Sequence, residues 1–166
     1  YLLANDGKGN FTNVTEQLAP SLTNMGMITD ATWADVDGDK DWDLIIVGDW
    51  MPVKIFINEK GRLTDQTAQW GLAQSRGWWN TLEPIDLDND GDKDMISSGY
   101  AGDIFYYQNT GSAAAPAFAA MVTNPFGITT VTNGYGYGAF TDLDNDGDQD
   151  LMVGNFDGNF FYYQNT

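Results

Sequence analysis

Short apolar segments separated by Gly, Asn and Asp recur along the whole chain. The runs at 44–48, 54–58, 95–99 and 104–109 are each too short for a typical helix, and no longer stretch shows a helical period. Strands at this close spacing, with turn residues between them, are typical of the all-β class. In IFYYQ (104–108) both faces are largely apolar, whereas a sheet with one wet face would alternate apolar and polar residues. We therefore expect sheets that are covered on both faces.

One acidic segment recurs three times. DVDGDKDWD, DLDNDGDKD and DLDNDGDQD begin at residues 35, 86 and 142, which lie 51 and 56 residues apart. Each is followed by a short apolar strand that ends in Gly and by a second strand that ends in Asn; YLLAN at the N-terminus has the same phase. Each period therefore reads as four short antiparallel strands. Repeats of roughly fifty residues with four strands indicate β-propeller blades, and a two-sheet sandwich of repeated hairpins is the alternative.

The repeats define the expected organisation of the chain. We predict a single propeller segment over residues 1–166, with repeat units at approximately 6–58, 59–109 and 110–165, and with residues 1–5 as the end of a preceding repeat. Closed propellers have about 4 to 8 blades. The roughly three blades predicted here are therefore expected to belong to a larger propeller, or to one completed by other copies of the chain.

Composition narrows the range of functions. The chain has 24 acidic and 7 basic residues, a formal net charge of −17, which argues against nucleic acid or anionic lipid as a partner because both need a basic surface. No apolar run approaches the roughly 18 residues of a membrane span, so we expect no membrane insertion. Cys and His are absent, which removes the commonest general base and the usual zinc ligands. We expect a protein that is not an enzyme.

The acidic loop carries Asp at positions 1, 3, 5, 7 and 9. Four carboxylates and the carbonyl of position 7 make an all-oxygen site, which suits Ca²⁺ better than Mg²⁺ or a transition metal. We expect about three Ca²⁺, one per loop. The candidate side-chain ligands are Asp35, Asp37, Asp39 and Asp43, then Asp86, Asp88, Asp90 and Asp94, then Asp142, Asp144, Asp146 and Asp150, and the candidate carbonyl ligands are Asp41, Asp92 and Asp148.

Two other interpretations of the loop are weaker. An EF-hand needs a Glu at position 12 and a helix after it, whereas position 12 is Ile46, Ser97 or Val153, each in an apolar strand. An acidic, solvated turn is the second alternative, because Asn-Asp-Gly is common in turns. Three loops with one carboxylate spacing at one phase of a repeat favour metal binding over that turn.

The first loop departs from the other two at position 6. Lys40 stands where the later loops have Gly91 and Gly147. If this position requires a positive φ, a Lys there costs on the order of 1 kcal/mol. We predict that the first site is the weakest of the three.

These motifs carry a resemblance to a known family. FTDLDNDGDQDLMVGNFDGNFFYYQNT (140–166) resembles the FG-GAP and VCBS repeats of calcium-binding β-propellers. The first two periods, with NDGKGNFTNVTE and WADVDGDKDWDLIIVGDW, are also similar to repeats found with ASPIC/UnbV modules. The resemblance covers nearly the whole chain and implies a Ca²⁺ in the first hairpin of each blade. It also implies an extracellular or cell-surface protein that serves adhesion, ligand binding or scaffolding.

We therefore expect a secreted calcium-binding module whose partners are neighbouring blades or copies of itself, and a protein or glycan ligand. The aromatics of GWWN (Trp78, Trp79) and GYGYG (Tyr135, Tyr137) could stack on sugar rings, although packing inside blades accounts for most aromatics in such cores. One alternative is a structural subunit of a self-assembling surface structure or filament. Another is the propeller domain of a polysaccharide lyase or hydrolase, an alternative that rests on fold analogy.

Overall fold

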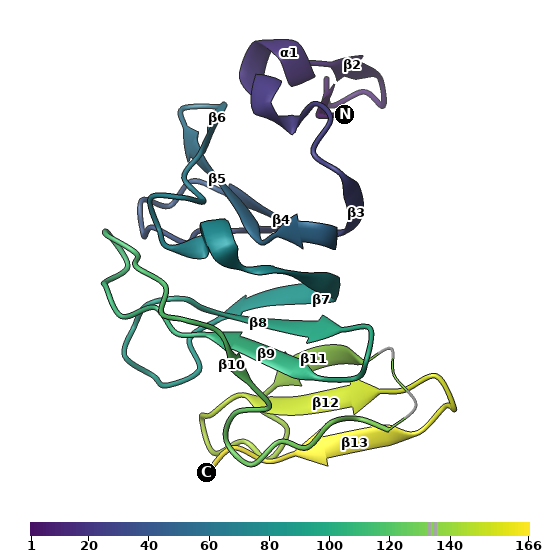
Figure 1. The fold of residues 1–166 in the computed structure, drawn as a ribbon. Coiled ribbons are helices and arrows are strands. Elements are labelled where there is room, and N and C mark those ends of the chain that lie inside the picture. Colours follow the sequence, from purple (N-terminus) through teal and green to yellow (C-terminus); the bar gives the residue numbers. More distant parts are fainter. Residues whose placement is uncertain (133, 135) are drawn as a thin grey trace.

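The computed structural model describes residues 1–132, 134 and 136–166, and antiparallel strands dominate it (Figure 1). A two-stranded hairpin and two short helical turns come first: β1 (Leu3–Asn5), β2 (Phe11–Asn13), α1 (Thr15–Leu18) and η1 (Pro20–Leu22). Three units lie below them in Figure 1 and are called here the first, second and third blades; the first two have four strands each and the third has three. None of the helices in the described residues is long and apolar enough to cross a membrane.

Consecutive strands form each blade. The first blade consists of β3 (Met27–Ala34), β4 (Asp43–Pro52), β5 (Lys54–Glu59) and β6 (Arg62–Asp65). After the turn η2 (Leu72–Gln74), the second blade consists of β7 (Arg76–Ile85), β8 (Asp94–Gly99), β9 (Ile104–Tyr107) and β10 (Val122–Thr123). The third consists of β11 (Tyr137–Thr141), β12 (Asp150–Gly154) and β13 (Phe160–Tyr163). The predicted all-β fold with propeller-type blades is confirmed, and the described strands form an open stack.

The sheets are offset from the predicted repeat units by one strand. The unit predicted at 59–109 starts with β6, but β6 pairs with β5 of the first blade. In the same way β2 pairs with β1, and Asn5 in β1 stands at the same position of the repeat as Asn58 in β5. The unit boundaries therefore remain a prediction about the sequence, and each completed sheet draws its last strand from the following unit.

Apolar side chains fill the space between blades. Ile45 and Ile55 of the first blade share a buried cluster with Trp79 and Leu82 of the second. The second and third blades meet in another cluster that includes Ile96, Ile104, Tyr106, Leu151 and Val153. On its far side the first blade packs Leu44, Ile46 and Phe56 against Ala19 and Leu22 of the N-terminal segment. Burying a side chain of this size contributes about 1.5–3 kcal/mol, so blade stacking is the main source of stability.

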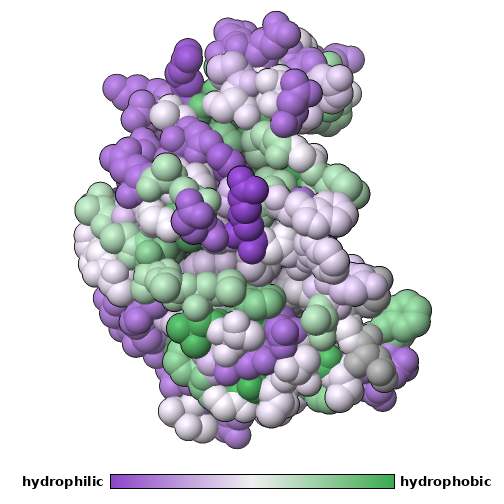
Figure 2. Space-filling model, viewed as in Figure 1, coloured by the Kyte–Doolittle hydropathy of each residue, from purple (hydrophilic) through white to green (hydrophobic). Residues whose placement is uncertain are grey.

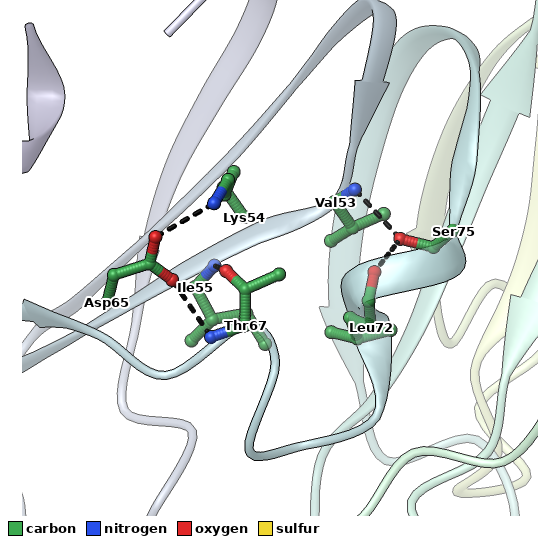
Figure 3. A network of polar contacts seen from close by, with 7 residues as sticks. All are labelled: Val53, Lys54, Ile55, Asp65, Thr67, Leu72 and Ser75. Carbon is green, nitrogen blue, oxygen red and sulfur yellow. Dashed lines mark hydrogen bonds and ion pairs between the residues drawn. The ribbon is translucent and has the colours of Figure 1, made fainter.

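Backbone contacts join the first two blades as well. The end of β4 pairs with the start of β7 from Asp49↔Trp78 to Pro52↔Arg76. Side chains from the segment before β7 bond to β5 and to the residue before it: Ser75 Oγ accepts from Val53 N at 2.9 Å, and Thr67 Oγ1 accepts from Ile55 N at 3.1 Å (Figure 3). Lys54 and Asp65 form an ion pair at 2.8 Å beside them. The bonds to Ser75 and Thr67 satisfy the backbone donors of Val53 and Ile55, which would otherwise be buried without partners.

Candidate metal centres

Each predicted loop brings three carboxylates together. In every loop the side chains at positions 1, 3 and 5 place one oxygen each within 4.8 Å of the others. The three groups are Asp35, Asp37 and Asp39, then Asp86, Asp88 and Asp90, then Asp142, Asp144 and Asp146. Each loop lies between the first two strands of its blade, and β4, β8 and β12 run from left to right in Figure 1, so the loops share the left edge of the stack.

The backbone of the loop explains why the carboxylates converge. Position 4 (Gly38, Asn89, Asn145) and position 6 (Lys40, Gly91, Gly147) have positive φ in all three loops. The carboxylate of position 1 accepts a hydrogen bond from the N–H of position 6 at 3.1, 3.1 and 3.2 Å. The carboxylate of position 5 accepts from the N–H of position 7 at 2.8, 3.1 and 3.0 Å. These side-chain turns fold the loop around its own acidic groups.

Position 9 has a different environment. Asp43, Asp94 and Asp150 are almost fully buried and are absent from the three-carboxylate groups. One oxygen of each accepts from the N–H of position 2 at 3.0, 3.4 and 3.0 Å. The other accepts from the N–H of an Asn close to the end of the third strand of the blade (Asn58, Asn109 or Asn165), at 2.9, 2.8 and 2.9 Å. In this structure position 9 fastens the loop to its blade, and its role as a metal ligand stays a prediction.

The second loop contains carboxylate oxygens that lack partners. Asp86 Oδ1 and Asp92 Oδ1 are buried, and neither accepts a hydrogen bond of normal geometry from the described part of the chain. A buried acceptor without a donor is costly, and it is costlier for a charged group. A cation bound by the group of Asp86, Asp88 and Asp90 would remove that cost at Asp86, so the donor set and this buried oxygen both fit a bound metal ion. The carbonyl role predicted for Asp41, Asp92 and Asp148 is untested.

Comparison with known families identifies the repeat. A sequence model described as an FG-GAP-like repeat matches residues 35–97 and again residues 86–153. Each match begins at the first Asp of one loop and ends in the strand after the next loop. The chain belongs to the FG-GAP-like repeat family. A search of curated proteins found no match, and the similarity to repeats found with ASPIC/UnbV modules stays a prediction.

The FG-GAP loops are held by residues that sequence reasoning missed. Tyr106 and Tyr162 donate their hydroxyls to the position-9 carboxylates Asp94 and Asp150, at 2.8 and 3.0 Å. The side-chain amides of Gln108 and Gln164 donate to position 3, to Asp88 at 2.8 Å and to Asp144. The repeated YYQN at one phase was the available signal, because a Tyr and a Gln that recur with the Asp loop are expected to serve it.

The first FG-GAP loop lacks these supports. Ile55 and Ile57 occupy the positions of Tyr106 and Gln108, so β5 supplies neither the hydroxyl to position 9 nor the side-chain amide to position 3 that the later loops have. Lys40 has φ 76°, which meets the condition for the predicted weakness of the first site. At position 4, a Cβ on Gly38 would lie 3.3 Å from Ala113 Cβ, so this loop has little room for the Asn found in the others. The weaker first site stays a prediction.

Burial shifts the pKa of several loop carboxyls. Desolvation raises the pKa of Asp43 to about 6 and raises the pKa of Asp37, Asp92 and Asp94 above the ordinary value. The pKa of Asp150 is lowered, chiefly by the hydrogen bond from Asn165 N–H. Neighbouring carboxylates add to the upward shifts at Asp37 and Asp92. A divalent cation acts in the opposite direction, because it stabilises the charged form.

Proposed function

We propose that this FG-GAP module binds Ca²⁺ in each Asp loop and that the ion is a structural clasp of the blade. The observation that carries the proposal is the convergence of three carboxylates at the same place in three successive blades. Ca²⁺ is favoured because it accepts about 6 to 8 oxygen ligands in flexible geometry, whereas Mg²⁺ demands a near-octahedral set. The ion would hold together the Asp loop of the first hairpin, which position 9 already bonds to the third strand of the blade.

Thermal unfolding tests the calcium proposal. An ion that binds only the native state stabilises it by mass action, so the melting temperature is expected to rise with Ca²⁺ and fall with a chelator. Asp90→Ala and Asp146→Ala each remove one member of a carboxylate group, and each is expected to reduce the calcium-induced rise. Equal melting temperatures in EDTA and in saturating Ca²⁺ would refute the sites.

In this proposal the module works outside the cell and has no catalytic role of its own. Loops of this kind in extracellular modules bind with dissociation constants of roughly 10⁻⁴–10⁻³ M, which suits an extracellular calcium concentration. Adhesion, ligand binding or scaffolding beside an enzyme all require a rigid, calcium-stiffened surface. Secretion to the outside can be tested by fractionating the source cells, and recovery of the protein only from the cytosol would contradict the proposal.

A second candidate function, assembly through the outer face of the third blade, is supported by one comparison. Phe160 and Tyr162 of β13 are 77% and 44% exposed. Ile104 and Tyr106 hold the same positions in β9, where they are 1% and 5% exposed because the third blade covers them. We propose that another blade, from the same protein or from a second copy, covers Phe160 and Tyr162. Sedimentation in Ca²⁺ separates the sources, since a monomeric 166-residue chain would contradict assembly through copies.

A further inference from the structure

Three aromatic residues, called here the aromatic trio, lie at the opposite end of the strands from the Asp loops. Trp50 stands near the end of β4, Trp78 near the start of β7, and Tyr100 directly after β8. Because β4 and β8 begin at the Asp loops, Trp50 and Tyr100 lie on the right-hand edge in Figure 1. In Figure 2 this edge shows pale residues of intermediate hydropathy. The trio is therefore separate from the metal centres.

The rings of the trio are held in place but remain open to solvent. Trp78 contacts Trp50 at a centroid distance of 5.6 Å and an interplanar angle of 84°, and it contacts Tyr100 at 5.6 Å and 90°. Edge-to-face pairs of this kind are attractive in their own right. Trp50, Trp78 and Tyr100 are nevertheless 63%, 47% and 49% exposed. Rings that are ordered before binding lose little conformational entropy when a ligand stacks on them.

The backbone at Trp50 is strained to present its ring. Trp50 has φ 56° and sits in an irregularity of the β4–β7 pairing between Asp49 and Met51. A bulky side chain at positive φ is a conformational outlier that costs free energy. Bulges commonly re-aim side chains near functional sites, and strain of this kind concentrates there. Met51 is buried beside it, so the irregularity keeps the core residue inside and turns the indole outward.

An exposed aromatic residue near the end of the second strand recurs in each blade, which suits a ligand built of repeated units. Trp50 is the second residue after Gly48, near the end of β4, and Tyr100 is the first residue after Gly99, where β8 ends, so the two aromatics lie one residue apart in the repeat. In the third blade Phe156 is the second residue after Gly154, where β12 ends, and is also exposed. A polymer that lies across the blade ends would meet an aromatic ring at each step.

We propose that the aromatic trio binds a neutral oligosaccharide. The apolar C–H faces of sugar rings stack on exposed indole and phenol rings, and the Asp49 carboxylate, which has no hydrogen-bond or ion-pair partner among the described residues, would accept sugar hydroxyls. An acidic saccharide is disfavoured by Asp49 and by a net charge of −17. This inference specifies the ligand of the binding module proposed above and does not depend on the identity of the metal.

Binding is tested on the calcium-loaded chain with neutral hexasaccharides of glucose, mannose and N-acetylglucosamine, followed by tryptophan fluorescence and calorimetry. At least one is expected to bind, and Trp78→Ala and Trp50→Ala are each expected to weaken it by about tenfold or more. Trp33→Ala is the matched control, because Trp33 is 44% exposed and lies in β3, outside the trio. It is expected to change the affinity by less than about twofold.

Three results would overturn the inference: no neutral hexasaccharide binds, Trp33→Ala weakens binding as much as Trp78→Ala, or only an apolar or cationic peptide binds through the trio. Trp78→Tyr guards against misfolding, since it keeps an aromatic ring and is expected to retain most of the affinity. The calcium-induced rise in melting temperature is measured on every variant. Absence of sugar binding in the unmodified chain with that rise intact would refute only the oligosaccharide, whereas absence of the rise in the unmodified chain would refute the calcium sites.

Discussion

Substitution of Asp90 by Asn is expected to change stability in opposite directions with and without calcium. Asp90 is an exposed member of the second carboxylate group, and its Oδ1 accepts from Asp92 N at 3.1 Å. Asn keeps an oxygen for that hydrogen bond and removes only the charge. The variant therefore isolates carboxylate repulsion, and its effect on calcium binding, from the conformation of the loop.

The magnitude follows from the spacing of the group. Two unit charges 4.8 Å apart repel by about 0.9 kcal/mol in water and about 3.5 kcal/mol at an effective dielectric of 20. Asp90 belongs to two of the three pairs in its group, and because it is exposed the lower figure applies. In EDTA, Asp90→Asn is thus expected to raise the free energy of unfolding by about 2 kcal/mol. In Ca²⁺ at a hundred times the dissociation constant, it forfeits about 2.7 kcal/mol of stabilisation from that site.

Urea unfolding in EDTA and in saturating Ca²⁺ measures both terms. The matched control is Asp49→Asn, which makes the same change in net charge outside the Asp loops and is expected to leave the calcium-induced gain unchanged. A variant Asp90→Asn that is less stable than the parent in EDTA would contradict the repulsion argument. An undiminished calcium-induced gain in that variant would show that Asp90 binds no ion.

Three further predictions concern the clasp and the first loop. Asp150→Asn is expected to destabilise the protein by about 2–3 kcal/mol in EDTA and in Ca²⁺ alike, because hydrogen bonds to a buried charge are lost; urea unfolding checks this, and an effect confined to Ca²⁺ would contradict it. Burial raises the pKa of Asp43 to about 6, above its unfolded value, so its stabilising contribution is complete at pH below the unfolded pKa and is lost as pH rises through about 6. Chemical unfolding in EDTA across this range should show that loss, and Asp43→Asn should flatten it. Lys40→Gly is expected to tighten calcium binding at the first site by about fivefold, because it relieves about 1 kcal/mol of backbone strain. A calorimetric titration measures this affinity, and an unchanged isotherm would refute the prediction.

The strands and the loops were predictable because their signals are local and repeated. The Asp spacing at residues 35, 86 and 142 and the two-sided apolar character of IFYYQ led directly to stacked blades with carboxylates that converge. The aromatics were harder to place. Trp78 and Trp79 are adjacent in the sequence, yet Trp79 is buried between blades with its Nε1 donating to Met51 O, whereas Trp78 is exposed. Tyr137 is exposed too, and Tyr135 lies outside the described residues.

Long-range contacts explain what the sequence could not show. Position 9 was predicted as a fourth carboxylate ligand, but its environment depends on backbone donors of Asn58, Asn109 and Asn165, fifteen residues away along the chain in each blade. The support from Tyr106 becomes visible only once β9 is placed beside β8. Likewise, Gly38 is understood only through Ala113, which approaches it from the second blade.

The second and third loops touch each other directly. Asn89 Nδ2, at position 4 of the second loop, donates to Asp148 Oδ1, at position 7 of the third, at 2.7 Å. An ion that orders one loop therefore helps to order the other, and a hydrogen bond worth about 1 kcal/mol corresponds to about fivefold coupling. Gly38 offers no such side chain, so the first loop is expected to fill independently. The second and third sites would then fill cooperatively as a pair, and the first site would fill separately. Asn89→Ala would remove the cooperativity of that pair.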